Sequence, residues 1–207
     1  MPAKIEAAGR NADPGAGSEV QCVEYVRRAY ERAIDWYKVA ETKAQLLLTA
    51  NGILVTILFG VLVGRPDDAA QVANVSGVET WAFFLVAVVA LIGALSCAAA
   101  TLLSQHQKNV SRTFHRLDVD PKDPLSYKPE VLWYFGYLAY LNADAAAERI
   151  RQADRAFEIR ALSFNLVNLS RIVLRKHRLI NAAWLLTSLC LILLMAGGTS
   201  ILIRTQF

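Results

Sequence analysis

The chain has 207 residues, of which 55% are hydrophobic, and its 22 basic and 18 acidic side chains give a net charge of +4 at pH 7. Three segments, 46–63, 81–103 and 182–203, contain no charged residue. As helices they would be roughly 27 to 35 Å long, enough to cross a hydrocarbon core of about 30 Å. This composition excludes a soluble globular protein and predicts an integral membrane protein with three transmembrane helices.

Two further classes of protein are excluded. The first apolar segment starts too late and runs too long for a secretory signal peptide. A typical transporter is built from repeated spans around a central site, whereas this chain has no internal repeat and lies mostly outside its spans. The cysteines at positions 22, 97 and 190 form neither a disulfide framework nor a zinc pattern.

The chain begins with residues 1–17, which have no periodicity and are expected to form a disordered arm. Ser18 and Gln21 then form a capping box, which predicts that a helix starts at Ser18. Residues 18–45 are predicted to be a cytoplasmic amphipathic helix that continues into the first span, because apolar residues recur at spacings of three and four. This apolar seam consists of Val23, Val26, Tyr30, Ala33, Tyr37, Ala40, Ala44 and Leu47.

The charges that flank the spans predict the topology. Several arginines and lysines precede the first span, whereas the loop at 64–80 carries Arg65 against three acidic residues. Basic residues also follow the second span and precede the third. The positive-inside rule therefore predicts a cytoplasmic amino terminus, a periplasmic loop at 64–80, a cytoplasmic module at 104–181 and a periplasmic tail at 204–207.

The cytoplasmic module is predicted to be a small helical bundle formed by inward extensions of the membrane helices. The second span is expected to continue as helix to about Leu117, before a loop in which three prolines exclude regular helix. From the capping candidates Asn142 and Asp144, a single helix is predicted to run through the third span. Its buried stripe is expected to contain Ala146, Ile150, Ala153, Phe157, Phe164, Val167 and Leu174. The predicted fold class is all-α.

No motif in the sequence supports a catalytic function. The three histidines lack the spacing of metal ligands on one helical face, and the aspartates at 118, 120 and 123 lack the glycine and glutamate of a calcium loop. No hydrolase, Walker A or dinucleotide motif occurs. We therefore expect a non-enzyme with no catalytic residue, metal or cofactor. Because the spans lack ionisable residues, a pore would have to form by assembly of a homo-oligomer.

Basic residues on the cytoplasmic helices leave two interpretations open. Two rows, at 108, 112 and 116 and at 171, 175 and 178, lie next to the membrane and suit anionic lipid headgroups. Arginines farther from the spans, at 149, 151, 155 and 160, suit a small anionic ligand. Arginine can hold a phosphate through two hydrogen bonds while an aromatic ring stacks on a base.

Two stretches resemble a known family. Residues 43–52, Lys-Ala-Gln-Leu-Leu-Leu-Thr-Ala-Asn-Gly, are similar to the entry into the first membrane helix of the Pycsar transmembrane effectors, the PycTM family. Residues 133–141, Trp-Tyr-Phe-Gly-Tyr-Leu-Ala-Tyr-Leu, followed by 160–163 and 174–180, look like the cytoplasmic core of the same family. The resemblance covers most of residues 40–194.

The resemblance implies an effector of anti-phage defence in the cell inner membrane. A separate cyclase makes cyclic CMP or cyclic UMP (cCMP or cUMP) upon infection, and the nucleotide activates the effector to impair membrane integrity, which causes abortive infection. It implies no nucleic acid polymer as a partner. We expect Arg155 and Arg160 to contact the phosphate and Tyr134 and Tyr137 to contact the base. The alternatives are a membrane-anchored scaffold that docks a partner protein and a small channel subunit.

Overall fold

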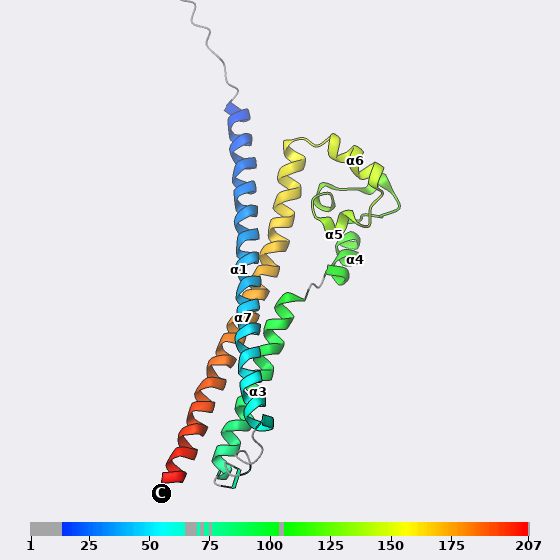
Figure 1. Cartoon of the computed structure of the whole chain (residues 1–207). Helices are drawn as coiled ribbons and strands as arrows, with labels where there is room; N and C mark the ends of the chain where they lie inside the picture. Colours follow the sequence, from blue (N-terminus) through cyan, green and yellow to red (C-terminus); the bar gives the residue numbers. More distant parts are fainter. Residues whose placement is uncertain (1–13, 65–69, 71–72, 75, 104–105, 207) are drawn as a thin grey trace, which may run out of the picture. The chain divides into compact units, whose positions relative to one another are not determined.

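The computed structural model describes residues 14–64, 70, 73–74, 76–103 and 106–206 (Figure 1). Two short 3-10 turns, η1 (Pro124–Ser126) and η2 (Pro129–Val131), lie in the segment 118–134. No strand occurs within these ranges, and the predicted all-α class is confirmed. The α-helices are α1 (Pro14–Gly64), α3 (Val78–Leu102), α4 (His106–Leu117), α5 (Phe135–Leu138), α6 (Ala143–Arg151) and α7 (Arg155–Gln206).

The chain divides into two compact units. The first, which we call the module, comprises Met1–Ile34 and Gln105–Leu169. The second, the membrane unit, comprises Asp35–Ser104 and Ser170–Phe207. Each unit therefore contains one part of α1 and one part of α7.

The membrane unit consists of parts of three helices, α1, α3 and α7, each long and apolar enough to cross a bilayer. Where these helices meet, fully buried alanines at 40, 44, 98 and 183 pack around Leu47 and Ile180. Small residues allow helix backbones to approach closely inside a bilayer. Large apolar side chains such as Ile57, Leu85 and Leu185 are exposed, which suits contact with lipid. The predicted set of three transmembrane helices is confirmed.

The amino-terminal half of α1 buries the predicted apolar seam. Val23, Ala33, Ala40, Ala44 and Leu47 are buried, and the remaining seam positions are half-buried. The helix begins at Pro14, so the predicted helix start at Ser18 is four residues too late. Proline fits the first turn of a helix because the N–H it lacks would have no partner there. Residues 1–13 of the predicted arm and parts of the loop at 64–80 lie outside the described residues.

Two helices that the sequence predicts to be continuous are interrupted. The helix α3 ends at Leu102, with Leu103 in an extended conformation, so the predicted continuation to Leu117 is wrong. The single helix predicted from Asn142 through the third span is also wrong, because α6 ends at Arg151 and α7 begins at Arg155. The Oδ1 atom of Asp154 accepts a hydrogen bond from the N–H of Phe157 at 2.7 Å. An aspartate in this position starts a new helix by pairing one of its free N–H groups.

The break at residues 152–154 changes which face of α7 is buried. Of the predicted stripe, Ile150, Val167 and Leu174 are about half exposed. Ala161 and Leu162 are buried instead. Ala146 is buried and Phe157 and Phe164 pack against the core of the module, so the stripe is correct at these positions. It is wrong at the others because the interruption resets the helical phase, so that spacings counted from Ala146 no longer identify one face.

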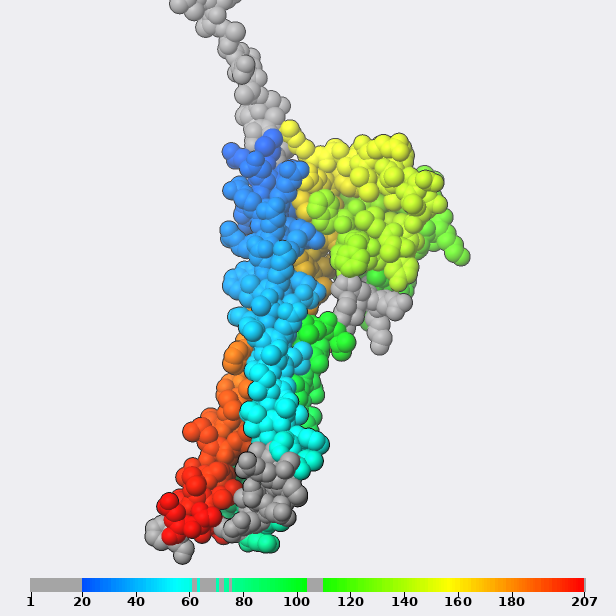
Figure 2. Space-filling model, viewed as in Figure 1, coloured from blue at the N-terminus to red at the C-terminus, as the bar shows by residue number. Residues whose placement is uncertain are grey.

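The core of the module gathers side chains from α4, the following loop, α5 and α6. The chain leaves α4 through Asp118, whose φ of 53° is left-handed. The N–H of Asp118 donates to His115 O and the N–H of Val119 donates to Phe114 O, which is the pattern of a Schellman motif. In Figure 2 the segment from η1 to α6 forms one closely packed surface. The buried core residues are Val110, Phe114, Val119, Tyr127, Val131, Leu132, Tyr137 and Ala146.

Asn142, one of the two predicted capping candidates, is the N-cap of α6, and Asp144 lies in its first turn. The side chain of Asn142 accepts a hydrogen bond from the N–H of Ala145 at 3.1 Å. The N–H of Asn142 in turn donates to the hydroxyl oxygen of Tyr127 at 2.9 Å. The same hydroxyl donates to Pro121 O at 2.7 Å, so Tyr127 joins the proline loop to the start of α6.

Replacing Tyr127 with phenylalanine should therefore destabilise the module. Tyr127 is only 5% exposed, and its removal leaves one N–H and one carbonyl oxygen without their partner. We expect Tyr127→Phe to lower the free energy of unfolding by about 2 kcal/mol, measured by circular dichroism during denaturation of the purified protein in detergent. Tyr140→Phe is the control, since Tyr140 is half exposed. Equal stability of the two variants would contradict the bridging role of Tyr127.

Candidate functional site

Three segments of the module meet around a set of arginines and aromatic rings that we call the junction. It is formed by α1, by η2 with the residues that follow it, and by the first turns of α7. Three contacts connect these segments, and each joins positions at least 30 residues apart in the sequence. The junction consists of Arg27, Tyr30, Glu130, Trp133, Glu158 and Arg160.

The first contact joins α1 to α7. The guanidinium of Arg27 donates two hydrogen bonds to the carboxylate of Glu158, at 2.5 Å and 2.8 Å. This hydrogen bonding, followed by the charge of Glu158, raises the pKa of Arg27. The side chain of Arg27 is 56% exposed, so the pair is within reach of solvent and of a competing anion. Exposed pairs of this kind contribute little to stability, and their arginines are free to exchange partners.

The second contact joins α7 to η2. The Nε of Arg160 donates to Glu130 Oε1 at 2.6 Å. The two side chains differ sharply in burial, since Arg160 is 62% exposed and Glu130 is 8% exposed. Asn165, one turn farther along α7, donates from Nδ2 to the backbone oxygen of Glu130 at 3.1 Å. The arginine predicted from the sequence is thus held beside a buried carboxylate whose backbone is fixed.

The third contact is between aromatic rings. Tyr30 of α1 and Trp133 meet edge to face, with centroids 6.1 Å apart. Trp133 is 42% exposed, so this indole presents surface to solvent. An exposed indole near arginines is a surface on which a base can stack. Tyr30 lies one helical turn after Arg27, and Trp133 lies three residues after Glu130.

The other predicted site residues lie in the same module but in different surroundings. Tyr137 is 6% exposed, and its ring contacts Phe114 and Tyr134 in the core. Tyr134 is half-buried, with its ring centroid 5.1 Å from that of Tyr137. Arg155 is exposed at the first turn of α7. The structure brings Arg160 to the junction, while the two tyrosines form an aromatic layer within the core of the module.

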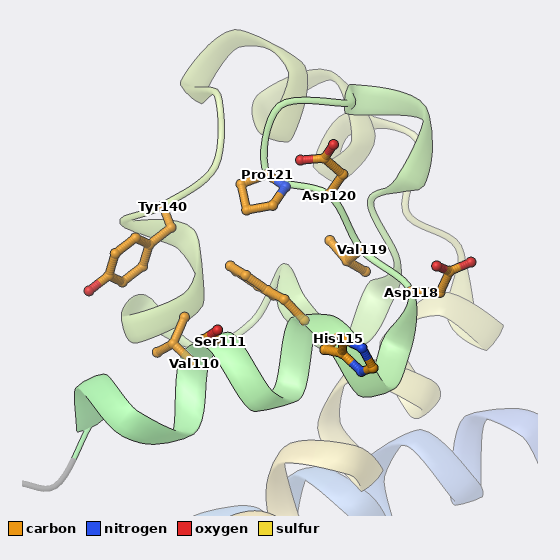
Figure 3. A pocket seen from close by; sticks show the side chains of 9 residues that line it. Val110, Ser111, His115, Asp118, Val119, Asp120, Pro121 and Tyr140 are labelled. Carbon is orange, nitrogen blue, oxygen red and sulfur yellow. The ribbon is translucent and has the colours of Figure 1, made fainter.

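The module also contains an open groove of about 770 Å³ beside α4. Figure 3 shows Val110 and Ser111 on α4, Tyr140 at one side, and Asp120 with Pro121 on the turn across from the helix. The lining includes two carboxylates, at Asp118 and Asp120. The described residues that line the groove include no arginine or lysine, whereas each carboxylate of the junction pairs with an arginine. Uncompensated carboxylates repel a phosphate, so the junction is the better candidate for an anionic ligand.

The aspartates of this loop are used to shape turns. Asp120 Oδ1 accepts from the N–H of Lys122 at 2.9 Å, and Asp123 Oδ1 accepts from the N–H of Leu125 at 3.0 Å. Asparagine and aspartate side chains commonly stabilise turns in this way. The hydrogen bonds agree with a turn rather than a calcium loop.

Of the six junction residues, only Arg160 was predicted from the sequence as a ligand contact; Arg27, Tyr30, Glu130, Trp133 and Glu158 were not. Tyr30 was assigned to the apolar seam, and Arg27 was counted only among the basic residues that precede the first span. Their spacing of three residues on one helix was the available signal, because it places both side chains on neighbouring positions of one face. Their pairing with residues more than 100 positions away had no counterpart in the sequence.

The basic rows next to the spans remain suited to lipid headgroups. Arg171, Arg175 and Arg178 are exposed on α7, and Arg112 is exposed on α4. Arg116 is also exposed and lies over the ring of Phe164 at 5.2 Å. The side chain of Lys108 lies outside the described residues.

Comparison with known proteins gives one match. The family model PycTM, described as the Pycsar effector protein domain, matches residues 25–203. No curated protein and no solved structure matches the chain. The family match covers both the module and the membrane unit, and it agrees with the three helices that can cross a bilayer. The chain therefore belongs to the Pycsar effector family, whose members act in anti-phage defence and receive a cyclic nucleotide signal from a separate cyclase.

Proposed function

We propose that a cyclic pyrimidine nucleotide, cCMP or cUMP, activates this membrane effector to impair the integrity of the inner membrane, and that the infected cell thereby stops growing. The observation that carries the proposal is the junction, where exposed arginines and an exposed indole lie together in the module. These groups match the phosphate and the base of a nucleotide. The family match supports a role in defence, and the chemistry of the junction supports this proposed ligand site.

In this proposal Arg160 and Arg27 bind the phosphate and Trp133 stacks on the base. Guanidinium groups bind phosphates with two parallel hydrogen bonds. Arg155, at the start of the same helix, is within the group of arginines proposed to attract the anion. Tyr134, which is half-buried and whose ring contacts that of the buried Tyr137, is proposed with Tyr137 to support the base from the core side.

The proposed orientation puts the module in the cytoplasm, where a cyclase would release its product. The positive-inside rule supports a cytoplasmic amino terminus, because basic residues outnumber acidic ones near the ends of the spans that join the module. Both α1 and α7 continue from the module into the membrane unit. A ligand that binds more tightly to one arrangement of α1 and α7 in the module would favour that arrangement along both helices.

The proposed activity is physical rather than enzymatic. It requires that several copies of the membrane unit rearrange so that ions or solutes cross the bilayer, because the predicted spans carry no ionisable group that would line a resting ion path. A homo-oligomer is the assembly that this proposal implies. No catalytic residue, metal or cofactor has a part in it.

Ligand binding is tested by thermal unfolding of the purified protein in detergent. We expect cCMP or cUMP to raise the melting temperature, because saturation at 100 times Kd stabilises the folded state by about 2.7 kcal/mol, whereas cyclic AMP should have less effect. Arg160→Gln should weaken the affinity by about 10- to 100-fold, since a hydrogen bond to a charged group is lost. Each variant is compared with its own unliganded form.

Arg151→Gln is the matched control. Arg151 is an exposed arginine that pairs with Glu148 three residues earlier on α6, outside the junction. The Arg151→Gln variant should bind the nucleotide with the same affinity as the unmodified protein. The absence of a shift with either pyrimidine nucleotide would overturn the proposed function, and equal weakening by both substitutions would overturn the junction as its site.

Dye release from liposomes separates the proposal from its two alternatives. Leakage that requires cCMP or cUMP supports the effector proposed here. Constitutive ion conduction would instead indicate a small channel subunit. No leakage under either condition would indicate a scaffold that docks a partner protein.

A further inference from the structure

The carboxylate of Glu130 is buried, and only one of its two oxygens forms a hydrogen bond within the described part of the chain. Its Oε1 atom accepts from Arg160, whereas Oε2 has no hydrogen-bond partner among the described residues. The residue is 6% exposed. Buried carboxylate oxygens are normally paired, because an unpaired one has lost its water without compensation. Such an atom beside a ligand site is a candidate acceptor for a ligand hydroxyl.

The position of this carboxylate is well determined by its surroundings. Asn165 Nδ2 donates both to Glu130 O at 3.1 Å and to Ala161 O at 2.8 Å. The buried residue Val131 follows Glu130 directly and has no exposed surface. The Asn165 hydrogen bond and the burial of Val131 therefore hold η2 in place without the help of Arg160. A side chain fixed in this way can discriminate between ligands that differ by one hydroxyl.

The chemistry of the ligand matches this pair of residues. In a 3′,5′-cyclic nucleotide the phosphate occupies two ribose oxygens, so the 2′-hydroxyl is the free ribose hydroxyl, and it lies on the carbon next to the 3′ oxygen. An anion and a hydroxyl donor are thus neighbours in the ligand. In the protein an arginine donor and a carboxylate acceptor are neighbours, with 2.6 Å between Arg160 Nε and Glu130 Oε1. Carboxylates are common acceptors for ribose hydroxyls in nucleotide sites.

We infer that Glu130 accepts a hydrogen bond from the ribose 2′-hydroxyl of the activating nucleotide while Arg160 turns to its phosphate. This inference rests on the proposed function and names the ribose contact within it. Arg160 is 62% exposed and has room to move toward a ligand in solvent, which uncovers the carboxylate. Removing its partner from a buried carboxylate is costly. The 2′-hydroxyl offsets that cost by donating a new hydrogen bond to Glu130. A 2′-deoxyribonucleotide lacks this donor and should therefore bind more weakly than the ribonucleotide.

The test compares cCMP and cUMP with their 2′-deoxy counterparts by calorimetric titration of the full-length protein in detergent. For the nucleotide that binds, we expect the 2′-deoxy compound to have a Kd about 10 to 100 times higher, as for loss of a hydrogen bond to a charged group. In Glu130→Met, which keeps the side-chain length but has only a weak, uncharged acceptor, this ratio should fall below about threefold. Circular dichroism checks that the variant is folded.

Glu158→Gln is the matched control. It removes the carboxylate that pairs with Arg27 but leaves Glu130 unchanged. The preference for the ribonucleotide should persist in this variant. Equal affinities of the ribo and 2′-deoxy compounds for the unmodified protein would overturn the inference while leaving the proposed function intact. Binding of neither ribonucleotide would overturn both. The comparison in the unmodified protein decides the inference even if Glu130→Met does not fold.

Discussion

Glu41→Gln is expected to lower the free energy of unfolding by about 3 kcal/mol, because it leaves the ammonium group of Lys176 buried without its counter-charge. The side chain of Lys176 is 9% exposed, and its Nζ lies 2.8 Å from Glu41 Oε1. The same Nζ lies 3.9 Å from the centroid of the Tyr37 ring. A cation–π contact stabilises the ammonium but does not neutralise its charge. Thermal unfolding in detergent measures the loss.

The double variant Glu41→Leu with Lys176→Met is the informative comparison. Replacing both partners of a buried ion pair with apolar residues is often neutral, so this variant should be at least as stable as the unmodified protein. Asp35→Asn is the control for the single change. Asp35 and Lys38 form a highly exposed pair with 3.9 Å between charged atoms, and its loss should cost less than about 0.5 kcal/mol. Equal effects of Glu41→Gln and Asp35→Asn would contradict the burial argument.

Thr187→Val is expected to cost about 1 to 2 kcal/mol, because it removes the partner of an amide side chain buried inside the membrane unit. Asn51 has no exposed surface, and its Nδ2 donates to Thr187 Oγ1 at 3.0 Å. The hydroxyl of Thr187 is also 3.3 Å from Asn51 Oδ1. Both residues lie in predicted spans, where no water replaces a lost partner. In liposomes, the weakened α1–α7 contact should increase dye release in the absence of nucleotide.

Thr56→Val is the control for this substitution. Thr56 is exposed, and its hydroxyl donates to Gly52 O of the same helix at 3.0 Å, so its removal leaves the helix contacts intact. The double variant Asn51→Leu with Thr187→Val should recover stability, because neither polar group is then left unpaired. Unchanged melting and leakage in Thr187→Val would show that the Asn51 hydrogen bond does not hold α1 to α7.

The correct predictions from the sequence rest on local patterns. The three apolar segments identify the spans, and the alternating spacing of three and four residues identifies the seam of α1, in which Ala40, Ala44 and Leu47 are buried. Asn142 was recognised as a cap because cap residues have a strong local preference. In these cases the cause of the structure lies within a few turns of the chain.

The incorrect predictions concern places where two local signals compete. Around Asp154 no glycine or proline breaks the sequence, yet the aspartate side chain pairs with a helix N–H and begins a new helix. The same residue type is tolerated inside helices. The break therefore depends on whether packing in the module favours a turn at this point, and the spacing pattern does not contain that information.

The candidate site was predicted only in part for a related reason. Arg160 was chosen because it is an arginine far from the spans, and the structure places it in the junction. Tyr137 was chosen for its aromatic ring, but that ring contributes to the core of the module. An aromatic side chain has the same propensities on a surface and in a core, and only the arrangement of surrounding elements decides between them.

Composition and length alone predict an all-α chain with three helices that cross a membrane, and the resemblance added the family. The bilayer acts on each segment as a solvent, so composition and length are sufficient to predict insertion. Which polar groups meet could be learned only from the three-dimensional arrangement of the helices. The contacts of Arg27 with Glu158, Arg160 with Glu130 and Asn51 with Thr187 join distant positions, because they follow from the packing of whole helices rather than from the residues beside them.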